Sequence, residues 1–138
     1  MNTNQLKVNP WDDDFKNHPE TEYKFEYNGY QCELRKHPLF SNWNGYVTLS
    51  KTHPFYHKKY NNISDKIDVH GQLTYSRLGT FGFDTAHTLT DILPGDSIYN
   101  IQSFFHDVDD INHKHYWTFD EVVEETKRMV DQFIFYEK

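Results

Sequence analysis

Residues 23–34 read YKFEYNGYQCEL, and this stretch decides the fold class. Aromatic or apolar residues alternate with polar ones on both sides of Asn28-Gly29, as they do in half-buried β-strands. Asn-Gly is favoured in a type I′ turn, because both central residues of that turn take positive φ. The stretch therefore predicts an antiparallel hairpin whose strands span residues 23–27 and 30–34.

Three further strands and one helix are predicted along the chain. Residues 43–49, 67–76 and 80–84 have the pattern of strands. Residues 118–121 read TFDE, a capping box in which the first and last side chains bind backbone amides of the first helical turn. Apolar residues then recur at helical spacing: Val122, Met129, Val130, Phe133 and Ile134. We expect an α+β fold, with an antiparallel sheet of about five strands and a C-terminal helix packed on it.

The length and composition fit one folded domain. The chain has 138 residues, and its 10 Tyr, 11 Phe and 3 Trp make it rich in aromatic side chains. A chain of this size builds one core, and disordered chains contain few aromatic residues. Asn9-Pro10 and His18-Pro19 interrupt any regular pattern near the N-terminus. We therefore expect an irregular N-terminal arm over residues 1–22 and a single α+β domain over residues 23–138.

The sequence argues against a membrane protein and against a secreted one. No stretch approaches the apolar length that a transmembrane helix needs. The N-terminal residues contain no apolar core of the kind found in signal peptides. The single cysteine, Cys32, has no partner for an internal disulfide, which suits a reducing compartment. We expect a cytoplasmic protein, and a homo-oligomer remains open.

Charge is distributed unevenly along the chain. Residues 31–90 contain seven Lys or Arg and four Asp or Glu, a net charge of +3, together with five histidines. The rest of the chain contains seven bases and seventeen acids, a net charge of −10. Affinity for nucleic acid comes from massed Lys and Arg, so we expect no generic nucleic-acid binding. A small anionic ligand needs only a local positive pocket, which the middle of the chain can supply.

The residues best suited to chemistry lie on the predicted strands 67–76 and 80–84. If these strands form a hairpin, Asp84 lies opposite His70 in one register. In the alternative register, two residues away, Asp84 lies opposite Gln72 and diagonal to His70. Asp84 and His70 share a face of the sheet in both registers, because side chains alternate along a strand.

His87 lies three residues beyond Asp84, where the strand is expected to end. We expect His70, Asp84 and His87 to converge in a cleft. A carboxylate beside an imidazole orients its tautomer and raises its basicity. Gly71 interrupts the strand pattern, which is typical of a bulge or of a close approach by a ligand or another part of the chain.

Three kinds of site and a purely structural role remain open for this cluster. His70, Asp84 and His87 would be the catalytic residues of a metal-free hydrolase in which an imidazole acts as general base or acid. The same three residues would be the ligands of an open zinc or manganese site, although no HxH, HExxH or CxxC spacing supports one. In a binding pocket, hydrogen bonds would hold phosphates or ribose while aromatic rings stack on a base. The predicted ligand-binding residues are His70, Gln72, Thr74, Tyr75, Asp84, His87, His53 and Trp43.

Four segments of the sequence occur in an order that is distinctive as a set. They are WNGYVT at residues 43–48, HPxY at 53–56, VHGQLTY at 69–75 and GFDTAH at 82–87. Together they resemble a family of small uncharacterised proteins encoded by tailed bacteriophages. The chain departs from the family pattern at Gln72, where a second glycine is usual. The resemblance implies a phage gene expressed in a bacterial cytoplasm, and it implies no reaction.

Small phage proteins often act against host systems, and the functional expectation is based on this general tendency. We expect a phage protein that binds a small anionic, nucleotide-like ligand, such as a host defence signal that it sequesters. One alternative is a His/Asp-dependent phosphodiesterase-type hydrolase that degrades such a nucleotide. The other is an acidic inhibitor of a host protein, in which the negative ends of the chain mimic nucleic acid. The sequence does not identify a cofactor.

Overall fold

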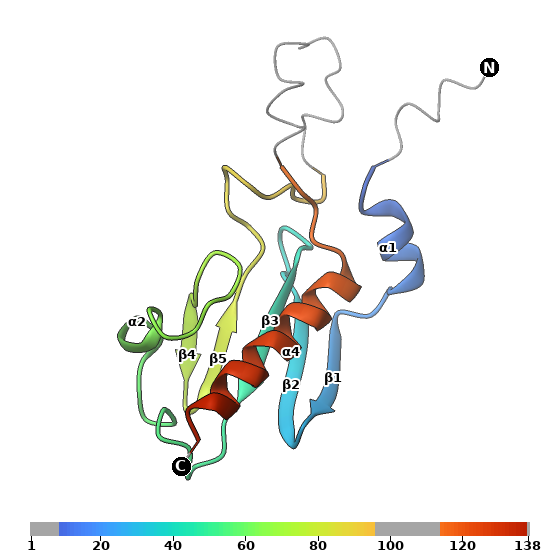
Figure 1. Cartoon of the computed structure of the whole chain (residues 1–138). Helices are drawn as coiled ribbons and strands as arrows, with labels where there is room; N and C mark the ends of the chain where they lie inside the picture. Colours follow the sequence, from blue (N-terminus) through green and yellow to red (C-terminus); the bar gives the residue numbers. More distant parts are fainter. Residues whose placement is uncertain (1–8, 96–113, 138) are drawn as a thin grey trace, which may run out of the picture.

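The computed structural model describes residues 9–95 and 114–137. A five-stranded antiparallel sheet carries the long C-terminal helix α4 on one face (Figure 1). This arrangement confirms the predicted α+β fold. The elements are α1 Asp12–Asn17, β1 Glu22–Tyr27, β2 Tyr30–Lys36, β3 Trp43–Thr48, α2 Tyr60–Ile63, β4 Tyr75–Arg77, β5 Thr80–Phe83 and α4 Phe119–Phe135.

The hairpin predicted from residues 23–34 is present. The strand order is β1-β2-β3-β5-β4, and β1 pairs with β2 so that Tyr27 lies opposite Tyr30. Asn28 has φ 50° and Gly29 has φ 85°. Both central residues of the turn therefore take the positive φ on which the prediction depended.

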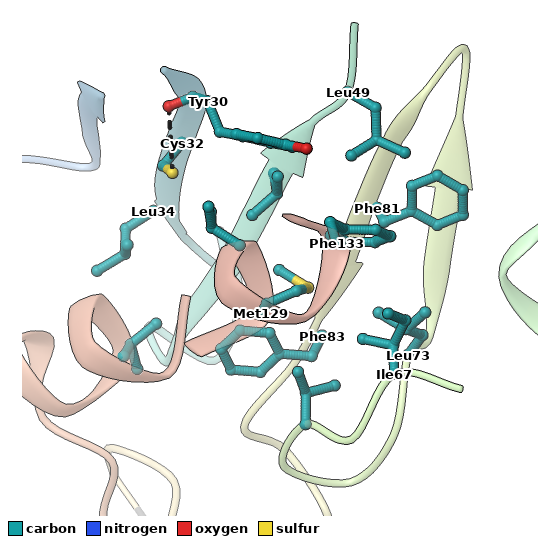
Figure 2. Close-up of a cluster of buried hydrophobic side chains, with 14 of the residues drawn as sticks. Tyr30, Cys32, Leu34, Leu49, Ile67, Leu73, Phe81, Phe83, Met129 and Phe133 are labelled. Atoms are coloured by element: carbon teal, nitrogen blue, oxygen red, sulfur yellow. Dashed lines mark hydrogen bonds between the residues drawn. The ribbon is translucent and has the colours of Figure 1, made fainter. Parts of the chain in front are cut away.

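The core lies between α4 and the inner face of the sheet, where aromatic rings from both layers meet (Figure 2). Trp43 on β3, Phe81 on β5 and Phe133 on α4 are fully buried. The helix begins with the predicted capping box, since the Thr118 hydroxyl accepts from the Glu121 amide and the Glu121 carboxylate accepts from the Thr118 amide. Within the described residues, no helix has the length and apolarity needed to cross a membrane.

The N-terminal segment is more ordered than predicted, because residues 12–17 form the short helix α1. The buried carboxylate of Asp14 accepts hydrogen bonds from the Tyr116 hydroxyl at 2.7 Å and from the Phe119 amide at 3.0 Å. It thereby satisfies an amide at the start of α4 that has no partner within the helix. Trp11 and Ile92 pack with Tyr116 in a second, smaller cluster. Long-range contacts of this kind are not visible in the local sequence pattern.

The strand predicted for residues 67–76 is wrong over most of its length, since β4 comprises only Tyr75–Arg77. The Gln72 amide donates to the Val69 carbonyl at 2.9 Å, and Gly71 has φ +65°. Glycine at the third position of a turn readily takes this conformation, so the chain reverses where the strand was expected to continue. Segment 67–74 pairs with the Gln132 side chain of α4, which binds the amide and the carbonyl of Asp68.

The predicted register of the last hairpin is also wrong. Arg77 lies opposite Thr80 and Tyr75 lies opposite Gly82. The tight turn at residues 78–79, with positive φ at both positions, fixes this pairing. The two predicted registers placed Asp84 opposite either His70 or Gln72, because both assumed that residues 67–76 keep one alternation throughout.

Candidate functional site

Three side chains meet beside the carboxyl end of β5: His70, His87 and Asp91. One nitrogen or carboxylate oxygen from each lies within 4.8 Å of the others. His70 comes from the turn at residues 69–72, while His87 and Asp91 come from the loop that follows β5. We call these three residues the His/Asp cluster. The prediction of a convergence held for the two histidines, but the carboxylate that joins His70 is Asp91 rather than Asp84.

Asp91 is the centre of the cluster. Its side chain has 0% exposure, and it accepts from His70 Nε2 at 2.8 and 2.9 Å, from the His87 amide at 2.9 Å and from the Thr90 hydroxyl at 3.2 Å. Burial, the largest influence on this carboxyl, raises its pKa, but the hydrogen bonds from His70 and the His87 amide outweigh it. The net pKa lies below the ordinary value. Asp91 is therefore held as a buried carboxylate.

His70 is fixed on all sides. An ionised carboxylate only accepts hydrogen bonds, so His70 Nε2 donates to Asp91. The His70 amide donates to Glu125 on α4 at 2.7 Å. The Trp117 ring lies against the imidazole, with the two ring centroids 4.4 Å apart. These contacts leave the His70 side chain 17% exposed and give the ring one orientation.

His87 packs on the turn that carries His70. Gly71 has no side chain, and a Cβ built there would lie 2.0 Å from His87 Nε2. Glycine is therefore required at this position by a close approach, as its place in the sequence indicated. His87 Nε2 is buried and lies 3.1 Å from Asp84 Oδ1. The pair is not aligned as a hydrogen bond, so this nitrogen has no hydrogen-bond partner among the described residues.

The space beside the cluster suits an ion or a few waters. A cavity of about 90 Å³ is lined by His87 and Asp91 together with Ala86, Thr88, Leu93 and Lys114. Pockets for nucleotide-sized ligands span roughly 300–1,000 Å³. The cavity that the described residues form at this cluster is therefore smaller than this range.

The other predicted site residues do not join the cluster as a group. Gln72 and Thr74 are exposed on the loop before β4. Tyr75 lies on β4, where its ring packs edge-on against Tyr46 with centroids 5.4 Å apart. Asp84 contacts the cluster only through His87.

Trp43 and His53 belong to the interior. Trp43 has 0% exposure, and its ring packs on Phe119 at the start of α4. His53 Nε2 lies 2.8 Å from the Phe133 carbonyl, and His53 Nδ1 accepts from the Phe55 amide at 2.9 Å. Because both ring nitrogens are engaged by backbone groups, the His53 side chain ties its loop to the end of α4. It also borders a pocket of about 330 Å³ next to Tyr30.

A larger pocket of about 530 Å³ opens beside the turn between β4 and β5. We call it the basic pocket. Four of its lining residues are cationic and none is acidic; it is lined by Lys51, Tyr56, His57, Lys58, Lys59, Ser76, Arg77 and Leu78. Within the described part of the chain, none of the four cationic side chains forms an ion pair with a carboxylate.

A fourth hollow, of about 610 Å³, lies along the exposed side of α4 and is lined mainly by acidic residues. Its lining contains Asp120, Glu121, Glu124, Glu125 and Asp131 together with two cations, Lys127 and Arg128. Arg128 is paired with Glu125 at 3.0 Å, and Lys127 lies 3.4 Å from Glu124. The acidic residues of the C-terminal segment are thus partly neutralised on their own helix.

Sequence reasoning missed Asp91 and the basic pocket. The Asp91 amide donates to the His87 carbonyl at 2.8 Å, which makes residues 87–91 one helical turn. The spacing of four residues between His87 and Asp91 is the signal that was available, because residues four apart share a helix face. The net positive charge of residues 31–90 indicated an anion site but not which cations converge.

Comparison of the chain with protein-family models, with curated proteins and with solved structures finds no match.

Proposed function

We propose that the protein binds a small, phosphate-bearing, nucleotide-like ligand in the basic pocket. The observation that carries this proposal is the convergence of Lys51, Lys58, Lys59 and Arg77 around a hollow of about 530 Å³ without any acidic lining residue. A pocket of this size is within the range for small-molecule ligands.

The electrostatics of the pocket favour a ligand with more than one negative charge. Four cations that share one hollow repel each other, and no described carboxylate compensates them. Hydrogen bonds between ammonium or guanidinium groups and phosphate oxygens are short and strong. An anion would therefore relieve the repulsion and gain these hydrogen bonds at the same time.

The pocket also offers apolar surface for a base. The Tyr56 ring lies directly on Gly79, which leaves no room for a side chain there. Leu78 has φ 50° and is 79% exposed. Asn or Gly is preferred at this turn position, and an exposed leucine adds nothing to the core. A ligand that contacts Leu78 and stacks on Tyr56 would give both side chains a role.

Binding without cleavage is the activity that the lining residues favour. His57 is the one imidazole that lines the basic pocket, and no carboxylate stands beside it to act with it. The two histidines expected to cleave a phosphodiester lie instead in the His/Asp cluster, next to a cavity of about 90 Å³. The lining residues therefore favour sequestration of the ligand over its cleavage.

Equilibrium dialysis against cyclic and linear nucleotides, with pyrophosphate and inorganic phosphate alongside, tests the proposal. We expect saturable binding of at least one nucleotide and weaker binding of phosphate. Lys58→Ala and Arg77→Ala should each weaken binding by about tenfold to a hundredfold, since a charge-assisted hydrogen bond contributes about 1.5–3 kcal/mol.

Lys24→Ala is the matched control, because it removes one positive charge from an exposed position on β1. It should leave the affinity within about twofold at physiological salt, where distant surface charges are screened. The proposal fails if no nucleotide binds, or if Lys24→Ala weakens binding as much as Arg77→Ala. Chromatography of the recovered nucleotide should return it intact, and a cleaved product would assign the hydrolase activity instead.

A further inference from the structure

We propose that the His/Asp cluster binds one divalent transition-metal ion, with His70, His87 and Asp91 as its ligands. Two imidazoles and one carboxylate form a donor set that zinc and related metals accept. This inference is independent of the proposed function. The basic pocket adjoins the turn before Thr80, whereas the cluster lies beyond Phe83, at the opposite end of β5.

The spacing of the ligand atoms is close to what a metal requires. Ligands at about 2.0–2.2 Å from a tetrahedral zinc ion are about 3.3 Å from each other. The three ligand atoms of the cluster lie within 4.8 Å of one another, and His70 Nε2 lies 2.8 Å from Asp91 Oδ1. Small side-chain shifts bring all three into contact with one ion.

The charge of Asp91 is the second argument. A fully buried carboxylate is stable only when it is paired or bound to a metal. Asp91 accepts hydrogen bonds from His70, the His87 amide and Thr90, but no described Lys or Arg forms an ion pair with it, and Lys114 borders the same cavity without pairing with it. A neutral imidazole carries one proton, so a divalent cation bound to His70 Nε2 needs the tautomer that holds this proton on Nδ1. The cation would then neutralise the carboxylate directly.

The buried nitrogen of His87 is the third argument. Gly71 covers His87 Nε2 so closely that no side chain fits between them, and the nitrogen has no hydrogen-bond partner among the described residues. Asp84 lies 3.1 Å from the same nitrogen. A metal ion bound to this nitrogen would therefore also lie near the Asp84 carboxylate, and zinc accepts carboxylate oxygens as ligands.

The cavity of about 90 Å³ next to His87 and Asp91 completes the site. Three protein ligands leave at least one coordination position for water or a small ligand, in contrast to structural zinc sites, which are closed by four side chains. The cavity provides room for that position on the side of Lys114.

Zinc titration of the full-length chain, after removal of metal with a chelator and dialysis, tests the inference. A chromophoric competitor reports the affinity, and elemental analysis reports the stoichiometry. We expect one zinc ion per chain, and at least tenfold weaker binding for His70→Gln, His87→Gln and Asp91→Asn. His37→Gln is the control, because His37 lies in the β2–β3 turn and accepts from the Leu39 and Phe40 amides. It should bind zinc like the original chain.

A second measurement needs no variant and remains informative if Asp91→Asn fails to fold. Diethyl pyrocarbonate modifies accessible imidazoles, and peptide mass spectrometry locates the modified histidines. Added zinc should protect His70 and His87 at least fivefold and leave His37 unprotected. The inference is overturned if the original chain binds no zinc, if the three cluster variants bind it as tightly as His37→Gln does, or if zinc protects all histidines equally.

Discussion

Replacing Gly71 with alanine tests whether the His87 ring is locked against the turn at residues 69–72. A Cβ at Gly71 would lie 2.0 Å from His87 Nε2 and 2.5 Å from His87 Cε1. Carbon–nitrogen contacts this short do not persist in folded proteins, so either the turn or the ring must move. The backbone would also have to hold alanine at φ +65°.

The expected loss of stability has two parts. An L-residue in the left-handed region costs roughly 1–2 kcal/mol. Forcing an extra methyl group into a packed contact costs roughly 1–3 kcal/mol more. Gly71→Ala should therefore lower the free energy of unfolding by about 2–5 kcal/mol, a large share of the roughly 5–15 kcal/mol that stabilises a typical domain.

Gly29→Ala separates the two parts. Gly29 has φ +85°, but a Cβ there would meet no atom within 4 Å. This variant carries the backbone penalty alone, so we expect a loss of about 1–2 kcal/mol. In the double variant Gly71→Ala/His87→Ala the clash is gone, and the coupling energy between the two positions should be about 1–3 kcal/mol.

Urea unfolding followed by circular dichroism measures the free energy of unfolding of the original chain, of Gly71→Ala, of His87→Ala and of the double variant. The reasoning is refuted if Gly71→Ala and Gly29→Ala destabilise the chain equally, or if the coupling energy is below about 0.5 kcal/mol, the usual error of additivity. Either result would mean that the His87 ring swings away freely. Zinc binding by Gly71→Ala should fall together with stability, because the same methyl group displaces a proposed ligand.

Three further outcomes follow from the packing. Thr118→Ala should lower the free energy of unfolding by about 1 kcal/mol, because its hydroxyl accepts from the Glu121 amide at 3.2 Å; urea unfolding checks this, and no change would mean that the cap is replaced by water. Phe133→Ala should lower it by about 3–5 kcal/mol, since the ring has 0% exposure; a smaller loss in the same assay would indicate a collapsible core. Burial raises the pKa of the Cys32 thiol to about 11, so a disulfide reagent at pH 8 should react at least tenfold faster in denaturant than in buffer. The raised pKa also means that this group's contribution to stability is complete below its ordinary pKa of 9.0 and is lost as pH rises toward 11.

The parts of the fold that local patterns encode were predictable. The hairpin around Asn28-Gly29 requires only a turn preference and two alternating strands. Helix α4 requires only a cap and an apolar stripe. Both patterns depend on residues that are close in the sequence, so they can be recognised without knowledge of the tertiary structure.

The site depended on contacts that no local pattern reports. Segment 67–74 keeps the alternation of a strand, with Ile67, Val69 and Leu73 buried. Yet the backbone of Asp68 and the amide of His70 bind side chains of α4, and only the Thr74 amide reaches β5, at the Gly82 carbonyl. A prediction based on alternation alone therefore assigned this segment to the sheet. Because the chain reverses at Gly71, His70 lies outside the sheet and next to Asp91.

The same non-locality explains why the basic pocket was missed as a site. Its cations come from the loop at residues 51–59 and from Arg77, and the tight turn at residues 78–79 brings these two segments together. The charge of residues 31–90 indicated an excess of cations in this part of the chain, but it does not determine which side chains share one hollow.

The position of α4 at the end of the chain has a consequence for biosynthesis. The inner face of the sheet, with Trp43, Phe81 and Phe83, is complete 35 residues before Phe119. At about 5–20 residues per second, a ribosome needs roughly 2–7 s to add that interval. For those seconds the nascent sheet presents aromatic side chains that α4 later packs against. A chain that stops before residue 119 would keep this face of the sheet exposed. We expect such a chain to aggregate or to be degraded by proteases, rather than to form a smaller folded domain.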